Sequence, residues 1–129
     1  KDKTIIAKLQ NNEIESIQTI NGVDTHYNRR TEEWLVWSPW ELSSVYVDGG
    51  ISLLNRSGDR IKQVSLLDQN GVLLLATEKE LSAFNPGYYV RHTLMSTNSY
   101  TVVSTNMTRR TLYFFGTFAG RTGVYSLEY

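Results

Sequence analysis

The chain has 129 residues, and 13 Lys and Arg balance 13 Asp and Glu. This neutrality excludes a dedicated nucleic-acid binder, which needs excess positive charge to displace counterions from phosphates, and the hydrophobic fraction of 40% excludes a disordered chain. Without cysteine there is neither a disulfide nor a thiolate metal site. No apolar run reaches the roughly 18 residues of a transmembrane segment. We expect a single β domain over residues 1–129.

The beginning of the chain leaves two structures open. Several apolar side chains fall partly at helical spacing, which keeps a helix as an alternative to a strand. These side chains are Ile6, Leu9, Ile14, Ile17 and Ile20. The residues that follow predict a hairpin from Ser16 to Tyr27 that folds about Asn21-Gly22, because Asn-Gly is the preferred pair for a type I′ turn.

All three tryptophans lie in the segment Trp34–Trp40. In a strand, Trp34 and Trp37 face opposite sides, so the segment predicts a strand that is buried on both faces. Pro39 has no N–H and ends regular pairing, which places Trp40 on a loop or at an edge. There the Trp40 ring can stack on a sugar, pack on a partner or cover the end of the core.

The middle of the chain predicts a second hairpin, from Arg60–Leu67 into Val72–Ala76. Its turn is Asp68–Gly71, which is rich in residues that favour turns. Apolar residues on consecutive positions of the second strand are typical of a strand covered on both faces. Thr77 and Glu80 then have the spacing of a capping box, which predicts one short helical turn.

The end of the chain predicts a third hairpin, which joins Thr111–Phe118 to Val124–Tyr129. The first of these strands is strongly apolar, and we expect it in the interior of a sheet. At an edge it would instead pair with another chain. Gly116 within it indicates a bulge or a close approach of two backbones.

The stretch from Leu81 to Tyr89 resembles the tyrosine corner of immunoglobulin-like sandwiches. That corner combines a Leu, an Asp or Asn, a Gly or Ala, and a Tyr. The matching residues are Leu81, Asn85, Gly87 and Tyr89. The resemblance implies that the Tyr89 hydroxyl bonds to upstream backbone at the point where the chain crosses between two sheets.

The predicted fold is therefore all-β: a single antiparallel β-sandwich, Ig-like in its central part, with an extra C-terminal hairpin. The resemblance implies that Tyr88–Leu94 and Tyr100–Thr105 are two of its strands. The alternative is a meandering lipocalin-like β-barrel, since most connections can be simple hairpins. Its cavity would be lined by Trp34, Trp37 and Tyr113.

The sequence offers no obvious catalytic or metal-binding set. Its two histidines, His26 and His92, are too few for a three-histidine metal site, and no G-x-S-x-G elbow is present. The adjacent Glu32 and Glu33 would point to opposite faces of a strand. We therefore expect a non-enzymatic protein with no catalytic residue, no metal and no cofactor.

Abundant aromatic residues without a catalytic set predict a binding or structural module. It would recognise a protein or a glycan through loops and exposed aromatics, with Trp40, Tyr46 and Tyr88 as the contact residues. We expect no nucleic acid partner and no transmembrane segment, and an edge strand offers a route to self-association. The alternative is a β-barrel that binds a small apolar ligand or pigment.

Two further expectations concern the setting of the protein. The start at Lys1 instead of Met predicts a processed form or an excised fragment. We expect a secreted, surface or virion-type assembly, and hence an extracellular or surface location. Asn55 and Asn106 stand in glycosylation sequons, and the sequence leaves open whether these are used.

Overall fold

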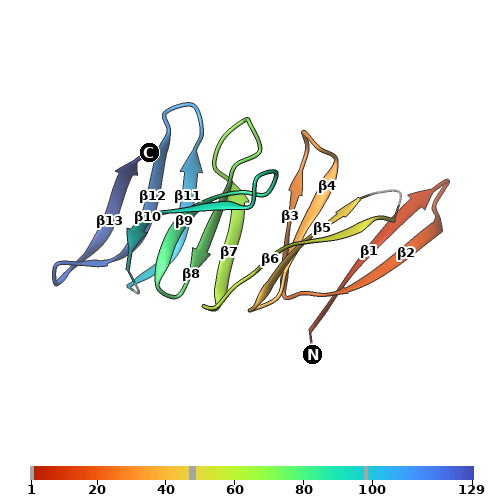
Figure 1. The fold of residues 1–129 in the computed structure, drawn as a ribbon. Helices are drawn as coiled ribbons and strands as arrows, with labels where there is room; N and C mark the ends of the chain where they lie inside the picture. The colour runs from red at the N-terminus through yellow and green to blue at the C-terminus, as the bar shows by residue number, and fades with distance from the viewer. Residues whose placement is uncertain (1, 47–48, 98) are drawn as a thin grey trace. The chain divides into compact units, whose positions relative to one another are not determined.

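A computed structural model describes residues 2–46, 49–97 and 99–129 (Figure 1). In these ranges the chain is all-β, with four open antiparallel sheets and no helix. The sheets are β1-β2, β3-β4-β5-β6, β7-β8-β9-β10 and β11-β12-β13. The strands are β1 (Lys3–Gln10), β2 (Glu13–Asn21), β3 (Asp24–Asn28), β4 (Glu33–Trp37), β5 (Glu41–Tyr46), β6 (Ile51–Arg56), β7 (Ile61–Leu66), β8 (Leu73–Thr77), β9 (Glu80–Asn85), β10 (Val90–Ser96), β11 (Tyr100–Asn106), β12 (Thr111–Phe118) and β13 (Arg121–Glu128).

The chain forms two compact units, Lys1–Ile61 and Lys62–Tyr129. In every sheet the strands lie in the order in which they occur along the chain, so each sheet is a meander. The last three meanders begin at nearly regular intervals, at residues 24, 61 and 100. Because no described sheet closes on itself, the lipocalin-like barrel is not formed. The single domain over residues 1–129 stays a prediction.

The first hairpin consists of β1 and β2, so the helical alternative for this segment is wrong. Its turn is Asn11-Asn12, whose φ angles are 52° and 66°. Asn tolerates the left-handed region better than most residues because its side chain bonds to nearby backbone. The hairpin expected between Ser16 and Tyr27 is also wrong, since β2 and β3 belong to different sheets.

Gly22 links these two sheets, and it is required there by close packing instead of by a hairpin turn. A Cβ atom on Gly22 would lie 2.5 Å from Cγ1 of Val36 and 3.3 Å from the carbonyl oxygen of Trp37. The Gly22 carbonyl accepts a 3.2 Å hydrogen bond from the Thr4 hydroxyl. Val23 donates its amide to the Trp37 carbonyl at 2.7 Å. The Asn21-Gly22 pair therefore holds the first hairpin against β4.

The second hairpin was correctly predicted. Asp68 organises its turn, because one carboxylate oxygen accepts hydrogen bonds from the amides of Asn70 at 2.8 Å and Val72 at 2.9 Å. Leu67 closes the turn by donating to the Val72 carbonyl. Every residue of β8 is buried, as expected for a strand that is apolar on both faces.

The turn between β8 and β9 contains the hydrogen bond predicted between Thr77 and Glu80, but in a connection between strands and not at the start of a helix. The Thr77 hydroxyl accepts a hydrogen bond from the Glu80 amide at 3.3 Å, as in a capping box, but the segment is a tight strand connection and the helical turn is wrong. The Glu80 carboxylate instead accepts hydrogen bonds from Ser82, Thr93 and Arg91. Burial alone raises the pKa of Glu80, but these hydrogen bonds and the Arg91 charge outweigh it and lower the pKa.

The tyrosine corner is not formed. Leu81 and Asn85 lie on β9, which pairs directly with β10 in one antiparallel sheet. Tyr89 is in the connecting turn with a φ of 54°, and its side chain is 72% exposed. A tyrosine corner needs a buried ring at a crossover between sheets, whereas this chain reverses within a single sheet.

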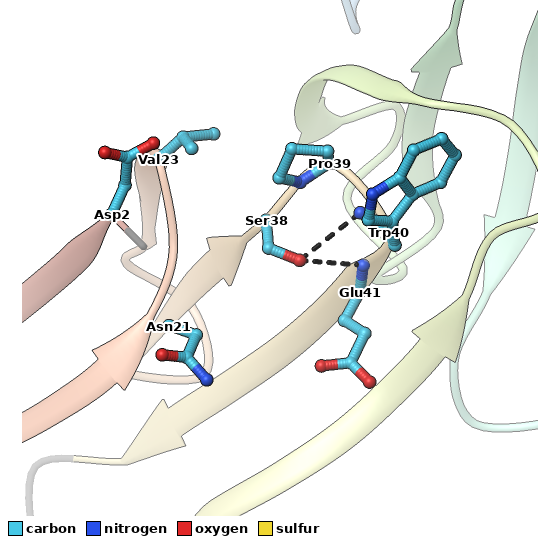
Figure 2. A pocket seen from close by; sticks show the side chains of 7 residues that line it. All are labelled: Asp2, Asn21, Val23, Ser38, Pro39, Trp40 and Glu41. Atoms are coloured by element: carbon cyan, nitrogen blue, oxygen red, sulfur yellow. Dashed lines mark hydrogen bonds between the residues drawn. The ribbon is translucent and has the colours of Figure 1, made fainter.

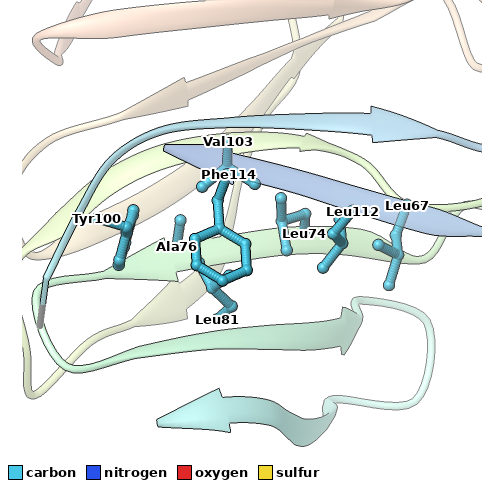
Figure 3. Close-up of a cluster of buried hydrophobic side chains, with 8 residues drawn as sticks. All are labelled: Leu67, Leu74, Ala76, Leu81, Tyr100, Val103, Leu112 and Phe114. Carbon is cyan, nitrogen blue, oxygen red and sulfur yellow. The ribbon is translucent and has the colours of Figure 1, made fainter. Parts of the chain in front are cut away.

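The core of the second unit joins its two sheets (Figure 3). Leu74, Ala76 and Leu81 from the β7–β10 sheet pack with side chains from β11 and β12. The remaining members are Leu67, Tyr100, Val103, Leu112 and Phe114. The second sheet also donates side-chain hydrogen bonds to the first, from Tyr100 to the Thr77 carbonyl and from Thr105 to the Leu66 carbonyl.

Tyr100 makes the stability of this unit sensitive to high pH. Burial, and secondarily the negative charge of Glu78, raise the pKa of Tyr100; burial also raises the pKa of Tyr129. A raised folded-state pKa stabilises the fold fully below the unfolded value near pH 10, and this stability is lost as the pH rises further.

We expect the free energy of unfolding in urea to fall as the pH rises above about 10, by at most about 1.4 kcal/mol per pH unit through Tyr100. In Tyr100→Phe the decline should be shallower, while stability at neutral pH falls by about 1 kcal/mol through loss of one hydrogen bond. An identical alkaline decline in both proteins would contradict this role of Tyr100.

The C-terminal hairpin is formed by β12 and β13, as predicted. Strand β12 lies between β11 and β13, so pairing of Thr111–Phe118 with another chain as an edge strand is excluded. Gly116 is opposite Tyr100 at an irregularity in the β11–β12 register. A Cβ on Gly116 would lie 2.1 Å from the carbonyl oxygen of Ser99, so the predicted close backbone approach is confirmed, while the irregularity itself lies between Tyr100 and Val102 of β11.

Candidate functional site

The candidate site is a cleft of about 440 Å³ in the first unit (Figure 2). One wall comes from the N-terminal hairpin and the link that follows it, and the other comes from the connection between β4 and β5. Seven residues line the cleft: Asp2, Asn21, Val23, Ser38, Pro39, Trp40 and Glu41. Its volume lies within the range of roughly 300–1,000 Å³ that is usual for ligand sites.

The connection between β4 and β5 is held by its own side chains. Pro39 has no N–H and interrupts the ladder. The Ser38 hydroxyl accepts hydrogen bonds from the amides of Trp40 at 3.3 Å and Glu41 at 3.1 Å, which Figure 2 shows as dashed lines. The Ser38 amide donates to the Glu41 carbonyl at 2.9 Å and closes the turn.

Trp40 combines a fixed backbone with an exposed ring. Its carbonyl accepts a 2.8 Å hydrogen bond from the Ser57 amide, and the Pro39 carbonyl accepts one of 2.8 Å from Ile61. The Trp40 side chain nevertheless remains 54% exposed. Because the backbone is already ordered, a partner that packs on this ring pays little additional conformational entropy. Trp37, three residues earlier, is only 3% exposed and belongs to the core as predicted.

The opposite wall is positioned by the contacts of Gly22. The Gly22 amide donates a 3.2 Å hydrogen bond to the Asp2 carbonyl, which ties the start of β1 to the link between the sheets. Asn21 and Val23 flank Gly22 and therefore both reach the cleft. The close approach of Gly22 to Val36 thus determines the position of three lining residues.

The cleft presents both polar and apolar surface. Val23, Pro39 and Trp40 are apolar, whereas the polar groups are two carboxylates, one amide and one hydroxyl. The Glu41 carboxylate pairs with Arg56 at 3.3 Å in an exposed ion pair, which stabilises the fold little. Carbonyl and carboxylate acceptors beside an aromatic ring suit a partner with N–H donors and an apolar group.

Several titratable groups on other strands have displaced pKa values. Burial lowers the pKa of His26 on β3, and the pKa values of Glu80, Tyr100 and Tyr129 change in the second unit. The cleft lining contains neither His nor Cys.

The three residues predicted as contacts do not form one site. Tyr46 is at the far end of β5 from Trp40, about 20 Å away at roughly 3.3 Å per residue. It lines a separate cleft of about 140 Å³ beside Trp34. Tyr88 is 81% exposed in the β9–β10 connection, which belongs to the second unit.

The sequence located Trp40 but missed the wall that faces it. Asp2, Asn21 and Val23 are far from Trp40 along the chain, and Asn21-Gly22 has the signature of a hairpin turn. Close packing at position 22 requires Gly, and a hairpin turn would require the same residue, so the pair Asn21-Gly22 fits both structures. The distinction therefore appears only when Val36 is placed beside Gly22.

Residues 2–46, 49–97 and 99–129 contain no cluster of three or more His, Cys, Asp or Glu side chains with the geometry of a metal site. The same ranges contain no helix that is both long and apolar enough to cross a membrane.

No family model and no curated protein matches the sequence. Among solved structures, the chain resembles the N-terminal domain of Nup159, with 15% identity and a TM-score of 0.57 over 91% of this chain and 34% of that one. It also resembles a chain in a complex of S. cerevisiae Dbp5 bound to Nup159, Gle1, IP6 and ADP. That match has 14% identity and a TM-score of 0.53, over 91% of this chain and 33% of the other.

These likenesses establish the all-β fold, and the chain spans about a third of the length of the solved chains. They do not test the Ig-like resemblance, so the sandwich stays a prediction. The expected extracellular or surface location is wrong, because the solved structures that the chain resembles contain Nup159 and give such a location no support.

Proposed function

We propose that this chain is a non-enzymatic protein-interaction module that binds a linear peptide segment of a protein partner at the Trp40 cleft. The observation that carries the proposal is the exposed Trp40 ring on a backbone fixed from both sides. Exposed aromatic side chains in such positions supply much of the binding energy at protein interfaces.

The topology supports a binding scaffold of the β-propeller type. Propellers repeat a four-stranded antiparallel meander as the blade, and two complete meanders of this kind follow one another here. In such scaffolds the connections between strands carry the variable contacts, while the ladders stay constant. The β4–β5 connection that contains Trp40 is one of these segments.

The matched structures support a protein partner. In one of them Nup159 is bound in a complex with Dbp5. By analogy of fold, a similar scaffold in this chain would also bind a protein. The cleft supplies an apolar surface for one side chain, and its carboxylate and amide acceptors can bind the N–H groups of a peptide.

Trp40→Ala should abolish this recognition without unfolding the chain. A library of random linear peptides displayed on phage is panned against the full chain, and the enriched peptides are synthesised and titrated. We expect Trp40→Ala to weaken their binding at least about tenfold. Its free energy of unfolding should fall by less than about 1 kcal/mol, because the ring is half-exposed.

Tyr88→Ala is the matched control, since it removes another exposed aromatic side chain from the other unit. It should leave peptide affinity unchanged. Failure to enrich any peptide, or equal affinity for wild type and Trp40→Ala, would reject the proposal. If the chain binds glycans on an array instead of peptides, and Trp40→Ala loses this binding, the partner is a sugar and not a protein.

A further inference from the structure

The first sheet carries an exposed apolar face. In the β1–β2 register, Ala7 is opposite Ile17 and Leu9 is opposite Ile14, so these side chains share one face of the hairpin with Ile5. Ile17 is 57% exposed, and the larger members of this set are all exposed. We call this set the hairpin face: Ile5, Ala7, Leu9, Ile14 and Ile17.

The last sheet also carries an exposed apolar face. Phe115 is opposite Val124, and Tyr113 lies two residues before Phe115 on the same side of β12. All three side chains are exposed, Phe115 to 47%. Beside them the hydroxyls of Thr117 and Thr122 hydrogen-bond to each other at 2.8 Å. We call Tyr113, Phe115 and Val124 the terminal face.

The strands equivalent to β12 in the preceding sheets are more completely buried than β12. Strands β4, β8 and β12 are the second strands of three successive meanders, and all three have consecutive apolar residues. The successive residues Leu35, Val36 and Trp37 of β4 are all buried, as is the whole of β8. In β12 the burial alternates: Leu112 and Phe114 are buried whereas Tyr113 and Phe115 are exposed. The composition of β12 is that of a strand covered on both sides.

Neighbouring sheets within a unit approach one another, and in the second unit two sheets share a core. In the second unit Leu74 and Ala76 of β8 share one core with Leu112 and Phe114 of β12. In the first unit Ile6 on the inner side of the hairpin lines a cleft with Trp34 of β4. The hairpin and terminal faces belong to the first and last described sheets. Their large side chains are exposed, although Ile5 and Ala7 also border the cleft beside Trp34.

The two faces are chemically compatible. Neither set contains a charged side chain. The hydroxyls of Thr122 and Ser126 border the terminal face, and Glu128 lies on the same side at the end of β13. Lys3 lies on the same side as the hairpin face at the start of β1. Contact between the two sets would therefore bury mainly apolar area. The aromatic side chains of one face and the branched aliphatic side chains of the other are a favourable combination for facing sheets.

We propose that the hairpin face of a second copy of this chain packs on the terminal face, so that copies associate head to tail. The association repeats between chains the sheet-on-sheet packing seen within the second unit. It is heterologous, because two different surfaces meet, and it produces a ring if the rotation closes and an open series if it does not.

Sedimentation velocity of the full chain tests this proposal. We expect wild type to form species larger than a monomer at about 100 µM, well above a micromolar Kd. Phe115→Asp and Ile17→Asp should each shift association to at least about tenfold higher concentration, because each places a charge in one face. Tyr89→Asp is the control, since it adds the same charge at an exposed site outside both faces.

Mixing the two variants distinguishes head-to-tail from like-to-like contact. Phe115→Asp retains the hairpin face and Ile17→Asp retains the terminal face, so an equimolar mixture should form a dimer although each variant alone is monomeric. A monomeric wild type, or self-association of either variant alone at the wild-type concentration, would overturn the proposal. Circular dichroism of each variant confirms that it remains folded.

Discussion

Gly116→Ala is expected to destabilise the second unit by about 3 kcal/mol. A Cβ at this position would lie 2.1 Å from the carbonyl oxygen of Ser99 and 2.8 Å from Cα of Tyr100. These are backbone atoms, so the clash is relieved only if β11 and β12 move apart. That movement would also break the 2.7 Å hydrogen bond from the Thr117 amide to Ser99. Equilibrium unfolding in urea measures the loss.

Gly123→Ala is the matched control, because Gly123 lies directly opposite Gly116 on β13. A Cβ on Gly123 meets nothing within 4 Å. This substitution should be neutral or should stabilise by up to about 1 kcal/mol, since it reduces the freedom of the unfolded chain. Equal stabilities of the two variants would show that β11 and β12 are not in close contact at Gly116.

Leu74→Ala is expected to cost about 3–4 kcal/mol. Leu74 is fully buried in the centre of the cluster that joins the two sheets of the second unit (Figure 3). Truncating its side chain to Cβ forfeits the burial of three carbon atoms and leaves a cavity that strands on both sides prevent from collapsing. The free energy of unfolding in urea is again the measurement.

Leu53→Ala provides the comparison with the same chemical change at an exposed position of β6. It should cost less than about 1 kcal/mol. Similar losses in the two variants would mean that Leu74 does not occupy a tightly packed core. A selective effect of Leu74→Ala, together with unchanged circular dichroism in the absence of urea, is the expected result.

The sequence predicted the strands best where pattern and turn chemistry agree. The hairpin about Asp68–Gly71 combines an apolar strand with a turn whose side chain bonds to the backbone, and both signals identify the same boundaries. The C-terminal hairpin was found for the same reason. Gly116 stands in a strand that is otherwise bulky, which made a close approach the simplest explanation.

The errors arose where one signal fits two structures. Asn-Gly favours a hairpin, but Gly22 is required by its contact with Val36, while the actual turn uses Asn11-Asn12. The pattern from Leu81 to Tyr89 matched a tyrosine corner by spacing alone. Spacing does not specify whether the next strand pairs in the same sheet or in another, and here β9 and β10 are neighbours.

The candidate site was only partly predictable for a related reason. The position of Pro39 shows from local chemistry alone that Trp40 leaves the ladder. The facing wall depends on contacts between residues that are far apart in sequence, and such contacts cannot be found from local propensity. Tyr46 and Tyr88 are also exposed aromatic residues, but they lie outside the Trp40 cleft. The sequence alone does not show which of the three residues lies at this cleft.

The meander order of the strands also has a consequence for how the chain folds. Each described strand pairs with the strand before or after it in the chain, so the strand pairings connect neighbouring segments. Local contacts cost little loop-closure entropy and favour rapid folding for an all-β protein. Each sheet takes its strands from one contiguous stretch of chain, so its strand pairings need no segment that is synthesised later.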